Sequence, residues 1–174
     1  SPERAVEVNR RILELDENNE VALSALERLY LATARYPELL GVYEKKLALE
    51  TDPQARRSIR YRIASLFEEE VKDPARAVDS YLAILVTDGD ELPALSALDR
   101  IYTQTARHPE LGDILARELA IVDPADTAAV VDLKFRLGRL REEHLSDVAG
   151  AIDCYRDLLD LDPSHAGARE SLER

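Results

Sequence analysis

Apolar residues recur along the chain with the three- and four-residue spacing of a helix, and short polar breaks interrupt this pattern. Leu23, Leu26 and Tyr30 illustrate the spacing, which puts all three side chains on one face of a helix. The same pattern predicts ten helices along the sequence. They cover residues 2–15, 19–34, 37–50, 54–71, 74–87, 91–106, 109–121, 125–144, 148–160 and 164–173.

The breaks carry residues that start and stop helices. Proline is tolerated in the first turn, where its missing N–H has no helical partner. Such prolines are Pro2, Pro37, Pro74 and Pro109. Asp73, and either Ser146 or Asp147, can cap the helix that follows, while Gly89 follows a helix end and Asp90 can start the next helix. Because the connections are so short, consecutive helices must fold into antiparallel hairpins.

The sequence repeats itself at long range. Residues 22–30 (ALSALERLY) recur at 94–102 (ALSALDRIY), an offset of 72 residues. Arg4-Ala-Val-Glu7 recurs as Arg76-Ala-Val-Asp79, and again in part as Gly150-Ala-Ile-Asp153. A large unit of about 70 residues with four helices therefore occurs twice, followed by part of a third copy.

Helix pairs of this kind cannot bury their apolar faces alone and must stack on their neighbours. We therefore predict an all-α fold, a right-handed α-solenoid of antiparallel helix pairs with about ten helices. Residues 1–174 would form one repeat array. The chain has no methionine and begins with Ser1 and Pro2, directly in a helical pattern. We expect it to be a segment of a longer repeat protein, although removal of a tag or propeptide would give the same start.

Composition and charge narrow the functional class. Hydrophobic residues make up 45% of the chain and charged residues 33%, with a net charge of −12. An excess of negative charge disfavours nucleic acid and anionic membrane surfaces as partners. No apolar run approaches the length of a spanning helix, and a lone cysteine, Cys154, forms no internal disulfide. The partner we expect is a protein or peptide, and the location we expect is the cytoplasm.

Candidate catalytic and metal-binding residues are sparse. His108, His144 and His165 are scattered, and no second ligand stands at metal-binding spacing on the same helix face. Acidic runs such as Glu68-Glu69-Glu70 are typical of solvated helix faces, and residues 88–91 lack the ligand spacing of a calcium loop. Cys154 has the character of a small buried residue. We therefore predict no enzyme activity, no cofactor and no metal.

The period of about 34–38 residues for each helix pair resembles that of the tetratricopeptide repeat (TPR) family. Two pairs carry the motif most clearly. In the last pair the matching residues are Leu137, Gly138, Ala151, Ile152, Tyr155, Leu158, Leu159, Leu161, Asp162 and Pro163. In the other pair they are Ile63, Ala64, Phe67, Ala77, Val78, Tyr81, Ile84, Leu85 and Asp88. Small residues such as Gly138 let two helices approach closely, and an aromatic ring fills the space between successive pairs.

The resemblance implies that the first helix of each pair lines a concave surface on which a partner segment lies. The first helices would be residues 19–34, 54–71, 91–106 and 125–144. Their inward-facing residues would be Ser24, Arg28, Tyr61, Ser65, Ser96, Arg100, Phe135 and Arg139, flanked by Arg62 and Arg136. Arg28, Arg100 and Arg139 would form a basic stripe that receives an acidic or C-terminal segment. In the alternative, these arginines pair with glutamates or aspartates of neighbouring helices.

The terminal helices would each lack one neighbour in such an array. We therefore expect end-to-end self-association, or contact with further repeats, through Val6, Ile12, Leu13 and Leu172.

Three functions remain open from the sequence. The first is a protein–protein interaction scaffold that binds a partner segment in the concave groove. The second is a helical-repeat RNA-binding or RNA-processing module, which the net charge of −12 opposes. The third is a regulatory or spacer segment of a larger enzyme.

Overall fold

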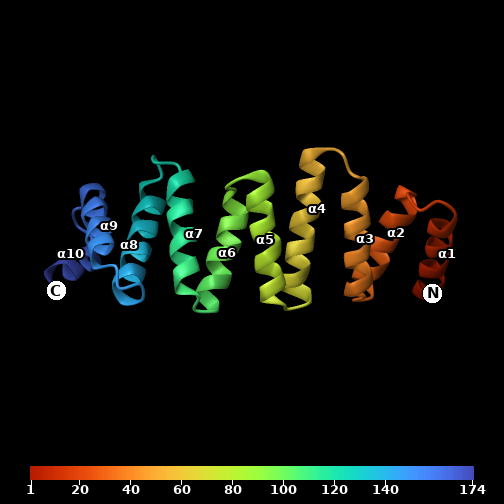
Figure 1. Cartoon of the computed structure of the whole chain (residues 1–174), viewed down its shortest axis with the longest axis horizontal. Coiled ribbons are helices and arrows are strands. Elements are labelled where there is room, and N and C mark those ends of the chain that lie inside the picture. The colour runs from red at the N-terminus through yellow and green to blue at the C-terminus, as the bar shows by residue number, and fades with distance from the viewer. The chain divides into compact units, whose positions relative to one another are not determined.

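The computed structural model describes residues 1–174, and every regular element in it is helical (Figure 1). The prediction of an all-α fold with ten α-helices is confirmed. The helices are α1 (Pro2–Leu15), α2 (Glu20–Ala32), α3 (Tyr36–Leu49), α4 (Pro53–Ser65), α5 (Pro74–Asp88), α6 (Leu92–Gln104), α7 (His108–Ile121), α8 (Thr127–Glu143), α9 (Val148–Leu161) and α10 (Ala166–Glu173). A short π-helical segment, η1 (Leu66–Glu70), continues α4.

The helices divide into two compact units, residues 1–87 and 88–174. Within each unit, consecutive helices run alternately up and down, as can be followed in Figure 1. Short connections impose this antiparallel order, and each helix buries its apolar stripe against the next. The predicted α-solenoid of antiparallel pairs is thus the fold class of the chain. Whether residues 1–174 form a single array stays a prediction.

Helix starts follow from capping residues. The Asn19 side chain accepts a hydrogen bond from the Ala22 amide at 2.9 Å, and Asp147 accepts one from the Gly150 amide at 2.9 Å. Each cap satisfies an amide that has no partner inside its helix. Asp90 does not cap α6 as expected. Instead, its carboxylate pairs with the guanidinium of Arg117 in α7, with an Nε–Oδ1 distance of 3.0 Å.

The end of α4 departs from the predicted regular helix. Here the Val71 amide donates to the Leu66 carbonyl at 2.9 Å, five residues back rather than four. A π-turn of this kind accommodates one additional residue in a helix.

Four of the turns inside helix pairs contain a residue with a left-handed backbone. The φ angles are 54° at Ala34, 58° at Lys72, 54° at Ala106 and 54° at Ser146. At Lys72 this conformation allows the next amide, that of Asp73, to donate to the Phe67 carbonyl at 2.9 Å. The turn thus satisfies a helix-end carbonyl, at a steric cost that a glycine would not incur.

Replacing Lys72 with glycine should increase the free energy of unfolding of the first unit by about 0.5–1 kcal/mol, because glycine adopts the positive φ without strain. Urea unfolding measures this change. Lys72→Ala is the matched control, since it removes the same side chain but keeps the strain. If Lys72→Gly is no more stable than Lys72→Ala, the turn does not carry this strain.

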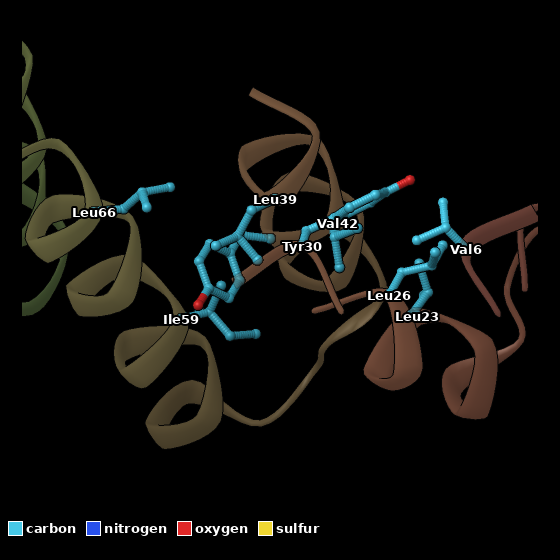
Figure 2. Packing of buried hydrophobic residues seen from close by; sticks show 9 residues of the cluster. Val6, Leu23, Leu26, Tyr30, Leu39, Val42, Ile59 and Leu66 are labelled. Carbon is cyan, nitrogen blue, oxygen red and sulfur yellow. The ribbon is translucent and has the colours of Figure 1, made fainter. Parts of the chain in front are cut away.

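The core of the first unit joins α1, α2, α3 and α4. Figure 2 shows side chains from all four helices pointing toward one another. The buried residues of this cluster are Val6, Leu23, Leu26, Tyr30, Leu39, Val42, Tyr43, Ile59 and Leu66. The helical spacing that predicted α2 therefore corresponds to its buried face, with Leu23, Leu26 and Tyr30 all in the core.

The core at the end of the second unit joins α8, α9 and α10. It consists of Ala151, Tyr155, Leu158 and Ala168, with Phe135 and Leu172 among the side chains packed against it. Gly138 of α8 lies directly beside Tyr155 and Cys154 of α9. The close approach expected from Gly138 is therefore present.

The four residues expected to mediate self-association differ in exposure. Val6 is buried within the first unit, and Leu13 packs against the same core. Leu172 packs against the α9–α10 cluster. Of the four, only Ile12 is strongly exposed, at 37%, and on α1 it lies with the exposed Val8 and Leu15. Self-association stays a prediction, and any apolar contact at α1 would involve Val8, Ile12 and Leu15 rather than Val6.

Candidate partner-binding site

A cavity of about 500 Å³ opens in the first unit where α2, α3 and α4 meet. Leu23 of α2 and Ile59 of α4 are buried side chains that contribute apolar surface to it. Ser24, Lys46 and Arg62 contribute polar groups from three different helices. The cavity therefore combines an apolar floor with hydrogen-bond donors, a combination typical of binding surfaces.

Glu27 connects the helices around this cavity. Its carboxylate accepts a hydrogen bond from the Arg62 guanidinium, with an Nη1–Oε1 distance of 2.7 Å, and it also pairs with the Lys46 ammonium. The Lys46 Nζ lies 3.1 Å from the Ser24 hydroxyl oxygen as well. Because Glu27 is on α2 and Arg62 is on α4, this network fixes two alternate helices on the same face of the unit.

The second unit has the same cross-helix link. Asp99 of α6 accepts two hydrogen bonds from Arg136 of α8, at 2.9 Å from Nη1 and 2.5 Å from Nη2. A cavity of about 360 Å³ lies beside Arg136, between α6, α7 and α8. Phe135 and Leu111 contribute apolar surface to it, and Arg139 lies at its edge. Alternate helices thus share a face in this unit too.

Glu118 of α7 is the one buried charged side chain of the structure, at 4% exposed. Its Oε1 accepts a hydrogen bond from the Ser96 hydroxyl at 3.2 Å, whereas its Oε2 is buried without a hydrogen-bond partner. Burial, followed by the nearby negative charge of Asp99, raises the pKa of the Glu118 carboxyl. Sequence analysis did not single out this residue.

The structure also joins two histidines that appear unrelated in the sequence. The rings of His108 and His144 stack with centroids 3.8 Å apart and planes 6° apart, at the edge of the cavity in the second unit. The corresponding contact in the first unit is a hydrogen bond of 2.6 Å from the Tyr36 hydroxyl to Glu70. This hydrogen bond raises the pKa of Tyr36. The 72-residue offset aligns Tyr36 with His108, whereas Glu70 and His144 are 74 residues apart, so a single offset does not align both contacts.

The eight predicted site residues divide between the two units. Ser24 lines the cavity of the first unit together with Arg62, and Phe135 and Arg139 line the cavity of the second. The remaining predicted residues, which line neither of these two cavities, are Arg28, Tyr61, Ser65, Ser96 and Arg100.

The aromatic members of the predicted set serve packing as well. The ring of Tyr61 lies 6.4 Å from that of Tyr81, and Phe135 packs against Tyr155 and His165 with centroids 6.2 and 4.6 Å away. Both side chains are half-buried, so each offers only part of its surface to a partner.

The predicted basic stripe is only partly open to a partner. Arg139 pairs with Glu143 one turn along α8, with an Nε–Oε1 distance of 2.9 Å, which is the arrangement of the alternative hypothesis. Arg28 is exposed and forms no ion pair. Because Arg28 belongs to the first unit and Arg100 and Arg139 to the second, a continuous stripe stays a prediction.

Other chemical features are few. No group of three or more histidine, cysteine or acidic side chains is arranged to hold a metal ion. No helix has the length and apolar character needed to cross a membrane. Cys154 is buried, and burial raises the pKa of its thiol, although the Arg141 guanidinium donates to Sγ at 3.3 Å. A raised pKa disfavours the reactive thiolate form.

Stacked antiparallel helix pairs whose alternate helices share one polar face define a helical-repeat scaffold for protein interactions. The sequence carries the signature of one such family: the model described as tetratricopeptide repeat matches residues 22–57. The resemblance to this family is therefore confirmed. The match covers α2, α3 and the start of α4, rather than the two pairs in which the motif is easiest to see.

Known proteins are similar to this chain in sequence or in structure. A human protein described as protein O-mannosyl-transferase TMTC1 is 28% identical over 166 residues, which cover 94% of this chain. The chain spans only 18% of the length of that relative. Among solved structures, YrrB, described as a TPR protein with an unusual peptide-binding site, has a TM-score of 0.51 and 17% identity, covering 99% of this chain and 84% of YrrB. BtubC from P. vanneervenii has a TM-score of 0.47 and 21% identity, covering 97% of this chain and 74% of BtubC.

Proposed function

We propose that this protein binds an extended segment of a partner protein along the face that alternate helices share. In the first unit this face belongs to α2 and α4, and in the second to α6 and α8. The partner we propose carries an acidic side chain or a C-terminal carboxylate, because arginine binds carboxylates with two parallel hydrogen bonds. Arg28, exposed on α2 and without an ion pair, is the group most available for this contact.

The observation that carries this proposal is the pair of links between alternate helices. Glu27 with Arg62, and Asp99 with Arg136, each join helices that are two apart in sequence. Such links hold polar side chains and half-buried aromatic rings on one surface before any partner arrives. A surface that is already ordered loses less conformational entropy when it binds.

Charge reversal tests the proposal. A library of displayed 12-residue peptides would be selected on the wild-type protein, and the binders would be measured on the double variant Arg28→Glu and Arg100→Glu. We expect acidic peptides to be enriched and their affinity to fall at least tenfold in the double variant, since like charges then face each other. The control variant, Arg4→Glu with Arg169→Glu, has the same net charge and alters exposed residues of α1 and α10. Equal loss in both variants would contradict the proposed surface.

One alternative has support from a specific observation. The 28% identity with a segment of a protein described as an O-mannosyl-transferase favours a regulatory or spacer role beside a catalytic domain. Glycosyl transfer measured with and without the homologous segment in that relative would test this role. Unchanged transfer would leave the partner-binding scaffold as the better account.

A further inference from the structure

The two units carry opposite charges at one equivalent position. Lys46 of α3 and Glu118 of α7 are 72 residues apart, the same offset that relates Ser24 to Ser96 and Glu27 to Asp99. In the first unit the Lys46 ammonium contacts both Ser24 and Glu27. In the second unit Glu118 also contacts the equivalent serine, but an acidic side chain now faces the acidic Asp99.

The surroundings of Glu118 do not compensate its negative charge. From α6 it meets the Ser96 hydroxyl and the Asp99 carboxylate, and from α8 it is influenced by Asp132 and Arg136. Arg136, the one cation of this group, directs both terminal nitrogens at Asp99. Glu118 Oε2 is left buried without a donor, so an ionised carboxylate would be poorly satisfied at this position.

We propose that Glu118 is a built-in acid-responsive element, which packs between α6 and α8 in its uncharged form and strengthens the second unit as the pH falls. Protonation removes the repulsion by Asp99 and Asp132, and the hydrogen bond from Ser96 to Oε1 can remain. At higher pH, Glu118 must either keep its proton or stay buried between the helices as an unpaired charge. The first unit lacks this property, because Lys46 neutralises Glu27 in the same place.

The direction of the pH dependence follows from the raised pKa of Glu118. A carboxyl whose pKa is higher in the folded protein than in the unfolded chain binds protons preferentially in the folded state. Its contribution to stability is therefore fully present below the pKa of an unfolded glutamate and is lost as the pH rises through the folded pKa. Paired carboxylates such as Asp90 and Glu110, whose pKa values are lowered, act in the opposite direction.

A glutamine at position 118 mimics the uncharged carboxyl and tests the proposal. Urea unfolding of the whole chain would be followed by NMR amide signals of α7, which report the second unit, at pH 5.0 and pH 7.5. We expect Glu118→Gln to raise the folding constant several-fold at pH 7.5. The ratio of the wild-type folding constant to the Glu118→Gln folding constant should rise several-fold when the pH is lowered from 7.5 to 5.0. Titration of the other groups affects both proteins alike and therefore cancels in this ratio. A ratio that is independent of pH would overturn the proposal.

A charge swap between the units provides a second, independent readout. Glu118→Lys recreates the arrangement of the first unit, with an ammonium near Ser96 and Asp99, and should stabilise the second unit at pH 7.5. The reciprocal variant, Lys46→Glu, should make the first unit less stable at pH 7.5. This loss of stability should be smaller at pH 5.0, where the new carboxyl can be protonated. Amide signals of α3 would report this change. Loss of stability in Glu118→Lys at pH 7.5 would contradict the proposal even if the glutamine variant failed to fold.

Discussion

Replacing Gly138 with valine is expected to lower the free energy of unfolding of the second unit by about 3 kcal/mol. A Cβ atom at this position would lie 2.7 Å from Tyr155 Cε1 and 3.2 Å from Cys154 Cβ. The two methyl groups of valine would extend further into a space that Tyr155, only 1% exposed, already fills. Additional methyl groups in a packed core typically cost about 1–3 kcal/mol. Urea unfolding of the variant and the wild type measures the difference.

Gly41→Val is the matched control for this prediction. Gly41 also lies inside a helix, α3, but no atom comes within 4 Å of a Cβ built on it. Valine there should leave stability unchanged or increase it by about 0.3 kcal/mol, the difference in helix propensity between the two residues. If both variants lose stability equally, the effect comes from valine in a helix and not from close contact between α8 and α9.

Raising the pH from 10 to 12 is expected to remove about 2–3 kcal/mol from the stability of the second unit. Burial, together with a hydrogen bond of 2.7 Å to Glu142, raises the pKa of Tyr155 to about 12. In the unfolded chain a tyrosine ionises near pH 10, so that between these values only the unfolded state gives up its proton. The contribution is fully present below pH 10 and is lost as the pH rises through 12.

Tyr155→Phe isolates this contribution. Because phenylalanine cannot ionise, the free energy of unfolding of this variant should not show the decrease between pH 10 and 12 that Tyr155 causes in the wild type. Tyr36 and Tyr43 have raised pKa values as well, but both belong to the first unit and are present in both proteins. Unfolding curves at pH 9, 10, 11 and 12, read from signals of α9, make the comparison. Parallel curves for the two proteins would show that Tyr155 does not titrate differently on folding.

The sequence was sufficient to predict the helices because each one has an apolar stripe and is bounded by capping or turn residues. The bounds of α1 agree with the prediction at both ends. The end of α4 moves from residue 71 to Ser65, and the other bounds shift by at most two residues. The shifts have local causes. The carboxylate of Asp126 caps α8 and moves its start to Thr127, while the π-turn after Ser65 ends the regular α-helix early.

The candidate site was harder to predict, because its main contacts join residues far apart in sequence. Helical spacing places Ser24 and Ser96 on the predicted inward face of their helices. It does not specify that Lys46 contacts Ser24, or that Glu118 contacts Ser96, from the neighbouring helix. The stacked pair of His108 and His144 is 36 residues apart for the same reason. Ion pairs also depend on side-chain rotamers, as in Arg139, which reaches Glu143 rather than standing free. Aligning the two repeats position by position would have exposed the exchange of lysine for glutamate.

An NMR map of the chain with a selected acidic peptide tests the central claim most directly, since it asks which helices contact a partner. Our account predicts that amide shifts on binding concentrate in α2 and α4, around Ser24, Arg28 and Arg62, and in α6 and α8, around Arg100 and Phe135. Shifts confined to α1, α3, α5, α7 and α9, with α2, α4, α6 and α8 unchanged, would contradict it.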